Sequence, residues 1–383
     1  MSRLQRTALI IGILGLVICL IGAIIDSTRF FEGYLFAYLF AIMIAQGCLA
    51  ILMIQFTVRG AWGLVLQRIL EAGAMTLPVL ALLFVPLLFG LPTLYPWARP
   101  ALVAQDALLQ HKSSYLNVPF FVVRSAIYFA VWIGLALTLR RWSRKQDEAN
   151  DPAVARRLQN LSIVGLLALV LTGTFALTDW VMSLEPDWSS TIYPMMVAMG
   201  GVLAAFALVI AVLARLEGSG LHGNLLTPQV SNDLGNLLLA ALLMWAYLAF
   251  SQYLVIWSGN LSDEITWYVR RIQGGWEWLA LLIVVFHFVV PFLLLLSRDL
   301  KRNLRRLGWV ASLLVIMHLL DTYWLVIPAL ESNIQLNLLA IAAVVGIGGL
   351  WSATFIWQLS QRPLLPKYSN VDVSSVQEAA AHG

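Results

Sequence analysis

Six ionisable side chains stand within long apolar stretches of this sequence: Arg124, Asp179, Glu277, His287, His318 and Asp321. Each such group costs about 2.5–3.5 kcal/mol where its stretch crosses the centre of a lipid bilayer, so few are retained without a role. Carboxylates and imidazoles can exchange protons, and a guanidinium can hold a carboxylate by pairing with it. These residue types therefore indicate a proton path, a polar pocket or buried ion pairs.

Asp179 and Asp321 lie at matching depths in their stretches. Each is about six residues inside the outer boundary, which is roughly 9 Å along a helix. Arg124 falls at a similar depth, so it can pair with either aspartate. One interpretation is a polar pocket or proton pathway, and the other is a buried Arg–Asp pair that only fixes helix packing. The candidate residues are Asp179, Asp321, His318, Arg124 and His287.

Metal and cofactor ligands are scarce in the sequence. His287 and His318 fall near mid-depth on neighbouring stretches, so one bis-histidine haem is a geometric alternative to a proton path. There is no C-x-x-C-H motif, and Cys19 and Cys48 stand inside apolar stretches. Phosphate-binding loops and zinc-protease motifs are absent too. The sequence therefore predicts no metal site and no covalently bound cofactor, and Glu277 is expected to be interfacial.

The composition describes the elements that must position these residues. Of the 383 residues, 60% are hydrophobic and 11% charged, and the mean hydropathy is +0.83. A water-soluble domain with this composition would expose large apolar patches. Crossing a bilayer takes roughly 20 apolar residues. Ten windows meet this requirement, near 7–25, 33–58, 75–92, 118–140, 159–183, 191–214, 234–257, 275–297, 307–328 and 336–360. We expect an all-α integral membrane domain over 1–362 and a polar cytoplasmic tail over 363–383.

Lys and Arg are distributed unequally between the two sides of these ten spans. With the N-terminus inside, eighteen of them fall in cytoplasmic segments, Arg59 and Arg68 among them. Five fall outside, namely Arg29, Arg99, Lys112, Arg270 and Arg271. Because basic residues are enriched in cytoplasmic loops, both termini are predicted to be cytoplasmic, in a bacterial inner membrane. The net charge of +4 then requires no nucleic-acid partner.

Two outer connections, 91–117 and 258–275, are long and rich in Trp and Tyr, with prolines in the first. They are predicted to be either interfacial segments or docking surfaces for a partner. A short repeat is also visible. The fifth span ends in TDWVMSLEP and the ninth in LLDTYWLVIPALE, while the fourth and eighth end in RRWSRK and SRDLKR. This spacing predicts two four-helix bundles, spans 2–5 and 6–9, flanked by spans 1 and 10.

Several segments carry a resemblance to a known family. They are LEAGAMTLPVLALLFVPLLFGLPTLYPWA, HKSSYLNVPFFVVRSAIYFAVW, TDWVMSLEPDWSSTIY, WAYLAFSQYLVIWSGNLSDEITWYVRRIQGGW and LLDTYWLV. The chain resembles the ActF subunit of alternative complex III, a bacterial quinol:cytochrome c oxidoreductase, among the NrfD-like and polysulfide-reductase-like membrane subunits. Over most of spans 2–9 the likeness is visible, and SQYLVIWSGNL followed by WYVRRIQGGW is its most specific part.

The resemblance implies a quinone-binding-type subunit of a respiratory or photosynthetic electron-transfer complex, with two four-helix bundles and two flanking helices. It implies several partner subunits: an NrfD-like sister subunit with the better-supported quinol site, an iron–sulfur subunit, and multihaem cytochromes c. Haem and iron–sulfur clusters would then lie only in partners, and a proton-translocation pathway through this chain is a further hypothesis. Whether quinone or menaquinone also occupies this chain stays open.

Other classes of function also accommodate these features. A secondary transporter would have spans, repeats and buried charges, although paired Gly/Pro-broken helices with a shared binding pattern are missing. A membrane anchor for extracytoplasmic redox subunits would need only the outer connections. A transporter should isolate alone, whereas a complex subunit should bring multihaem and iron–sulfur partners with it.

Overall fold

A computed structural model describes residues 2–149, 151–217 and 225–365, and over these residues the protein is helical, with no strand. Within these residues, ten helices are long and apolar enough to cross a membrane, so the protein is an all-α, multi-pass integral membrane protein. The spans, in order, are α1 (Arg3–Ile25), α2 (Ser27–Val58), α3 with α4 (Ala61–Ala74, Leu77–Phe89), α8 (Val118–Ala149), α9 (Pro152–Trp180), α10 (Ile192–Leu216), α11 (Pro228–Gly259), α13 with η5 and α14 (Trp276–Ile283, Val284–Val289, Val290–Leu296), α16 (Leu304–Val326) and α17 (Leu338–Ser360).

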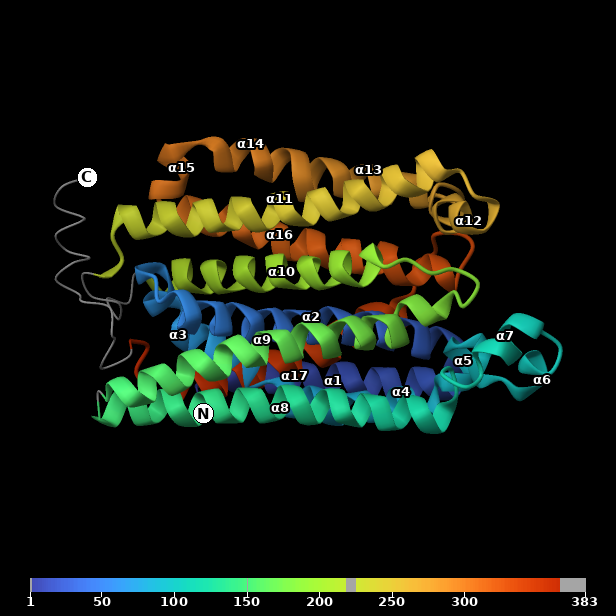
Figure 1. Cartoon of the computed structure of the whole chain (residues 1–383), viewed down its shortest axis with the longest axis horizontal. Helices are drawn as coiled ribbons and strands as arrows, with labels where there is room; N and C mark the ends of the chain where they lie inside the picture. Colours follow the sequence, from blue (N-terminus) through green and yellow to red (C-terminus); the bar gives the residue numbers. More distant parts are fainter. Residues whose placement is uncertain (1, 150, 218–224, 366–383) are drawn as a thin grey trace.

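Short helices connect the spans at both ends. They are α5 (Leu91–Leu94), η1 (Pro96–Ala98), α6 (Pro100–Val103), α7 (Ala107–Lys112), η2 (Met182–Leu184), α12 (Ser262–Arg271), α15 (Arg298–Arg302) and η6 (Ile327–Ala329). Figure 1 shows α5–α7 and α12 at one end of the molecule, which we call the α12 end, and α15 at the other, the α15 end. The expected outer connections thus share one end.

All ten predicted spans are present, and most of their ends lie within a few residues of the prediction. The start of the third span differs most, because it lies at Ala61 instead of near residue 75. Helices α2, α9 and α11 also begin six or seven residues earlier than predicted, and α8 ends at Ala149 instead of near residue 140. The first half of the third span contains the polar residues Gln67, Arg68 and Glu71, which are typical of a connection exposed to water. In the structure these side chains are buried and bonded to one another and to α8, so their polarity is satisfied inside the protein. Arg68 therefore lies within a span.

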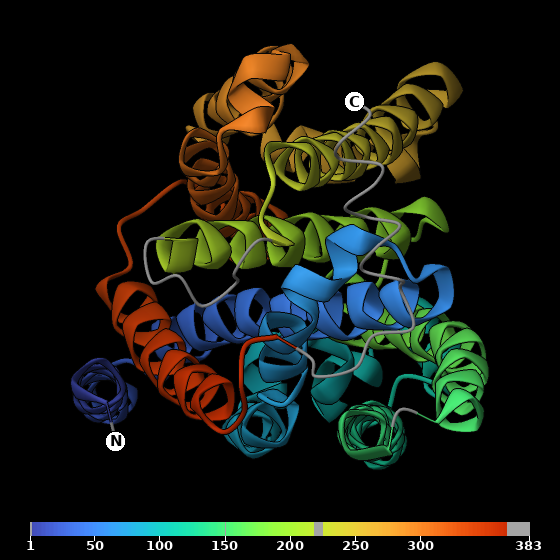
Figure 2. The same cartoon turned by 90° about the vertical axis from the view of Figure 1, so that its left-hand side faces the viewer.

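The spans form two four-helix bundles, as predicted. In the first bundle α2 packs against α3, α4 and α9, and α8 packs against α4 and α9. In the second, α10 packs against α11 and α16, while α13 and α14 pack against α16. The bundles meet along α2 and α10, which run through the middle of the molecule in Figure 2. Both α9 and α16 end in a 3₁₀ turn, η2 or η6, which supports the internal repeat.

Close backbone contacts at glycines join these units. A Cβ atom on Gly47 of α2 would lie 2.5 Å from the carbonyl oxygen of Gly201 in α10, so the two bundles approach through bare backbone. The flanking helix α1 lies on the outside against α17 (Figure 2), where a Cβ atom on Gly15 would lie 2.6 Å from the nitrogen of Gly346. Small residues permit such close packing between membrane helices.

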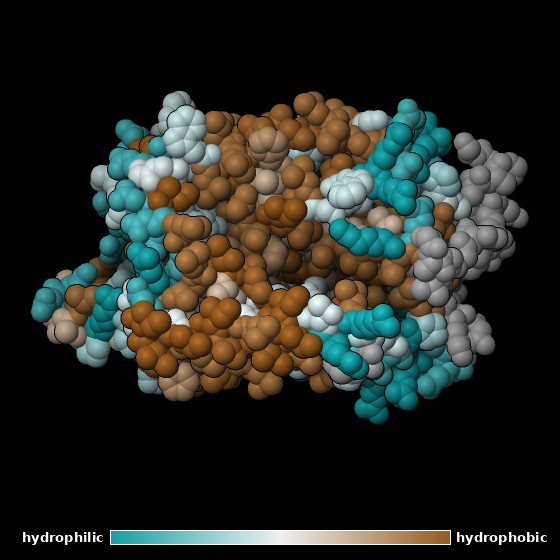
Figure 3. Space-filling view, turned by 180° about the vertical axis from the view of Figure 1, so that it is seen from behind, coloured by the Kyte–Doolittle hydropathy of each residue, from teal (hydrophilic) through white to brown (hydrophobic). Residues whose placement is uncertain are grey.

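Hydrophobic and hydrophilic residues are distributed over the surface as expected for a membrane protein. On the face drawn in Figure 3, a broad hydrophobic band covers the middle of the molecule, and hydrophilic residues gather towards both ends. Large apolar side chains such as Leu82, Phe89 and Trp309 are exposed within or beside the spans. Lipid tails can solvate these residues, whereas water would not.

Candidate functional site

Asp179, the first aspartate of the candidate pathway, has a hydrogen-bond partner at both carboxylate oxygens. Asp179 is 0% exposed, and Arg124 donates to both of its carboxylate oxygens, from Nε at 2.8 Å and from Nη2 at 3.0 Å. The Tyr128 hydroxyl donates a third hydrogen bond at 2.8 Å. This bidentate pair joins α8 to α9. Asp179 therefore has the partners that a buried, ionised carboxylate requires.

Arg124 is held by more than the aspartate. Its Nη1 donates to the carbonyl oxygen of Tyr115 at 2.8 Å. Its guanidinium carbon lies 3.9 Å from the Tyr115 ring centroid and 4.3 Å from that of Phe120. Such contacts favour a fixed cation. At this position the geometry favours a packing pair over a proton carrier.

The second aspartate has different surroundings. Asp321 is buried, and its Oδ2 lies 3.7 Å from Nδ1 of His318, which is too long for a hydrogen bond. The His287 ring lies beside His318, with 6.2 Å between ring centroids. Within the described residues, Asp321 Oδ2 and both nitrogens of each imidazole have no hydrogen-bond partner. We call Asp321, His318 and His287 the histidine–aspartate cluster.

An irregular turn positions His287. Span eight changes from α-helix to π-helix at Val284–Val289, which contains His287. Single π turns inside α-helices often occur at functional sites. The imidazole packs on the indole of Trp245, with ring centroids 4.3 Å apart. Opposite, a Cβ atom on Gly200 would lie 3.0 Å from Cε1 of His318, so the glycine leaves room for that ring.

The two aspartates belong to separate groups. Tyr38 of α2 packs against Trp180, the neighbour of Asp179, with ring centroids 6.2 Å apart. Phe40, two residues on, packs against His318 at 5.9 Å. Helix α2 thus contacts both groups and lies between the helices that carry them. The structure joins Arg124 to Asp179, and His318 and His287 to Asp321.

A cavity of about 780 Å³ lies next to the histidine–aspartate cluster in the second bundle. Its walls are almost entirely apolar and aromatic, and Asp321 and Trp324 of α16 line it. In the described residues, Trp324 Nε1 is another buried atom without a hydrogen-bond partner. Other lining side chains come from α10, α11, α12, α13 and η5. The cavity therefore has a large apolar volume, and two of its lining residues each carry a buried polar atom that has no hydrogen-bond partner among the described residues.

The cavity borders the lipid-facing surface between α11 and span eight. Helix α11 packs against α14 and α15 towards the α15 end and against α12 at the other end. Cavity-lining side chains on both helices, including Tyr247, Phe250 and Val284, are exposed on the outside of the bundle. A ligand could thus enter from the hydrophobic band.

Helix α12 contributes Trp267 and Tyr268 to the lining of the cavity, and two ion pairs fix its position. Arg271 is fully buried and donates to Glu185 at 3.0 Å, while Arg270 donates to the other oxygen of that carboxylate at 2.9 Å. Burial lowers the pKa of Arg271, against the opposing effect of Glu185. Part of the outer connection 258–275, predicted to be interfacial or a docking surface, therefore lines the cavity inside the protein.

Charged residues at the α15 end were not recognised as a cluster from the sequence. Arg68 pairs with Glu71 at 2.9 Å and also contacts Asp147. Arg362, just after α17, pairs with both carboxylates at 3.0 Å. Four charges thus tie α3, α8 and the end of α17 together. The i, i+3 spacing of Arg68 and Glu71 was the available signal.

Glu277, expected to be interfacial, lies in the first turn of α13 and accepts a hydrogen bond from the Gly275 amide at 3.0 Å. In the part of the chain that the structure describes, no group of three or more His, Cys, Asp or Glu could hold a metal ion.

In comparisons with known protein families and with curated protein sequences, nothing matches this chain.

Proposed function

We propose that this chain is the membrane subunit of a quinol:electron-acceptor oxidoreductase of the alternative complex III type, and that its cavity binds the quinone ring. Two four-helix bundles with two flanking helices agree with the architecture that the ActF resemblance implies. In this proposal the chain lies in a bacterial inner membrane with both termini cytoplasmic, as its basic residues indicate. Its partners are the sister, iron–sulfur and multihaem subunits.

The cavity carries the proposal. Its volume of about 780 Å³ lies in the range of small-molecule sites, and its aromatic walls suit a flat ring. The position beside the lipid-facing surface suits a ligand with an isoprenoid tail, because the tail can stay in the bilayer. A polar solute of a transporter would find few partners here.

Asp321 and Trp324 each line the cavity and have a polar atom without a partner in the described residues, and these atoms suit the polar atoms of a quinol. The Asp321 carboxylate can accept a hydrogen bond from a quinol hydroxyl, and the Trp324 indole N–H can donate to a quinone oxygen. Oxidation of a quinol releases two protons and two electrons. Asp321 and the adjacent His318 and His287 receive protons, and the electrons pass to carriers in the partner subunits.

Filling the cavity tests this assignment. Ala246 and Ala249 of α11 line the cavity, whereas Ala240 of the same helix is exposed and does not. We expect Ala246→Trp to lower the amount of quinone that co-purifies with the complex, measured by solvent extraction and mass spectrometry, while Ala240→Trp leaves it unchanged. Equal quinone content in the two variants and the parent would exclude this cavity as a quinone site.

A further inference from the structure

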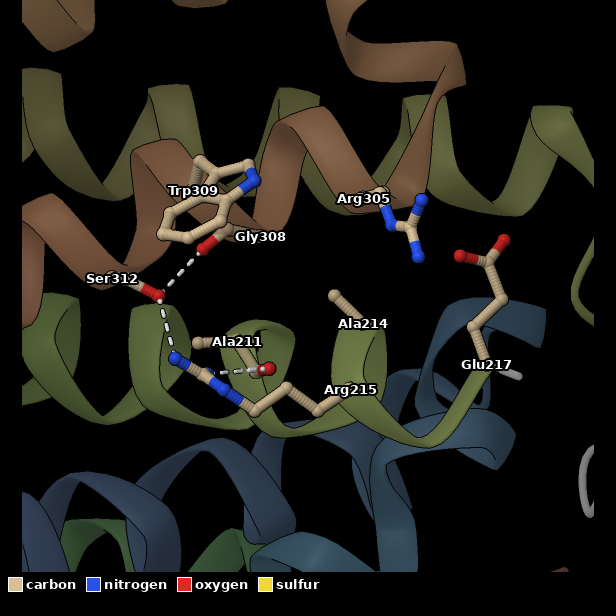
Figure 4. Close-up of a pocket in the computed structure, with 8 residues that line it drawn as sticks. All are labelled: Ala211, Ala214, Arg215, Glu217, Arg305, Gly308, Trp309 and Ser312. Carbon is tan, nitrogen blue, oxygen red and sulfur yellow. Dashed lines mark hydrogen bonds between the residues drawn. The ribbon is translucent and has the colours of Figure 1, made fainter. Parts of the chain in front are cut away.

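A second cavity lies between α10 and α16 at the α15 end of the molecule. Its volume is about 440 Å³, and Figure 4 shows the side chains that line it. The two helices pack tightly beside it, since a Cβ atom on Gly308 would lie 2.5 Å from that of Ala214. This contact brings side chains from both helices to one cavity. None of its lining residues belongs to the histidine–aspartate cluster.

The cavity presents two guanidinium groups from different helices. Arg215, in the last turn of α10, extends back along its helix, donating to the carbonyl oxygen of Ala211 at 3.0 Å and to the Ser312 hydroxyl at 3.5 Å. Arg305 comes from the first turn of α16. Figure 4 shows it on the other side of the cavity, turned towards Glu217. Two cations and one carboxylate leave the lining with a net charge of +1.

The lining includes a large aromatic side chain at the surface of the molecule. Trp309 lies one turn into α16 from Arg305, and its side chain is 72% exposed. Exposed tryptophans of membrane proteins gather at the level of lipid headgroups. The cavity thus has a cationic part near the helix ends and, one turn further into the span, an exposed indole.

We propose that this cavity binds the phosphate headgroup of an anionic membrane lipid, with Arg215 and Arg305 contacting the phosphate and Trp309 packing along the upper acyl chain. Guanidinium groups hold phosphate oxygens through paired N–H donors, and basic pockets between membrane helices bind such headgroups. Ser312 offers a further hydroxyl donor. Free phosphate shares the headgroup chemistry, but it would make no use of the exposed indole.

Native mass spectrometry of the delipidated full-length protein tests the site. Phosphatidylglycerol and cardiolipin are titrated against phosphatidylcholine as the zwitterionic reference. Removing one arginine, in Arg215→Gln or Arg305→Gln, should weaken binding of the anionic lipid about 5-fold, given the usual contribution of a basic residue near a lipid headgroup. Arg306→Gln is the matched control, because it removes the same charge from the next residue of α16, which does not line the cavity.

Each outcome decides the proposal. Weaker anionic-lipid binding in both cavity variants, with parental binding in Arg306→Gln, supports the site. Equal losses in all three variants would show only a diffuse charge effect and would overturn it. Inorganic phosphate is the separate arm: if millimolar phosphate displaces the lipid from the parent, the acyl chains contribute nothing and the lipid assignment is wrong. Equal affinity for the zwitterionic lipid would contradict it as well.

Discussion

Removing the charge of Asp179 should destabilise the protein far more than removing that of Asp321. Asp179 is fully buried and accepts three hydrogen bonds, two from Arg124 and one from Tyr128. In Asp179→Asn the Arg124 cation stays buried without its counter-ion, which costs about 3–5 kcal/mol of unfolding free energy. Asp321 Oδ2 makes no hydrogen bond to any described residue, so Asp321→Asn should cost less than about 1 kcal/mol.

A graded series extends this comparison. Tyr128→Phe removes one hydrogen bond to a charged group and should cost about 1.5–3 kcal/mol. Replacing both partners, in Arg124→Met with Asp179→Leu, should recover most of the loss, because no unpaired charge is left. The unfolding free energies are measured by denaturant titration in mixed micelles. Equal destabilisation by Asp179→Asn and Asp321→Asn, or full additivity in the double variant, would refute the reasoning.

Three further predictions concern the flanking helices, the topology and the cofactors. Gly346→Leu should detach α1 from α17 without unfolding the bundles. Gly348→Leu should not detach it, because a Cβ atom there would meet no described atom within 4 Å. The yield of a cysteine cross-link between α1 and α17 measures the difference. Reporter fusions after Lys145 should report the cytoplasm and fusions after Asp263 the outside, and the reverse pattern would overturn the orientation. The isolated chain should be colourless, and a pyridine haemochrome spectrum with stoichiometric haem b would instead establish the bis-histidine alternative.

The helical architecture was predictable because a bilayer imposes a simple rule on sequence. Each crossing needs a long apolar run, so ten spans and their order followed from hydropathy, and the repeat indicated the two bundles. The first half of the third span was missed for the same reason. Arg68 and Glu71 interrupt the apolar run, and only the structure shows that Ser143 and Asp147 satisfy them.

The candidate site was predictable in its residues but not in its grouping. Depth along the sequence placed Asp179, Asp321 and Arg124 at one level, but depth does not say which helices are neighbours. Arg124 stands on α8, which packs against α9, so it pairs with Asp179. The π turn at His287 and the cavity beneath α12 depend on how helices diverge, and no local pattern in the sequence specifies that.

The most direct test of the account is quinol oxidation by the assembled complex in vesicles, with proton release recorded at the same time. Asp321→Asn keeps the shape of the side chain but cannot carry a proton. We expect this variant to assemble with its partners and to lose about 100-fold in quinol oxidation, the lower range for removal of a general base. Parental rates of oxidation and proton release in a normally assembled Asp321→Asn complex would contradict the proposed role of the histidine–aspartate cluster.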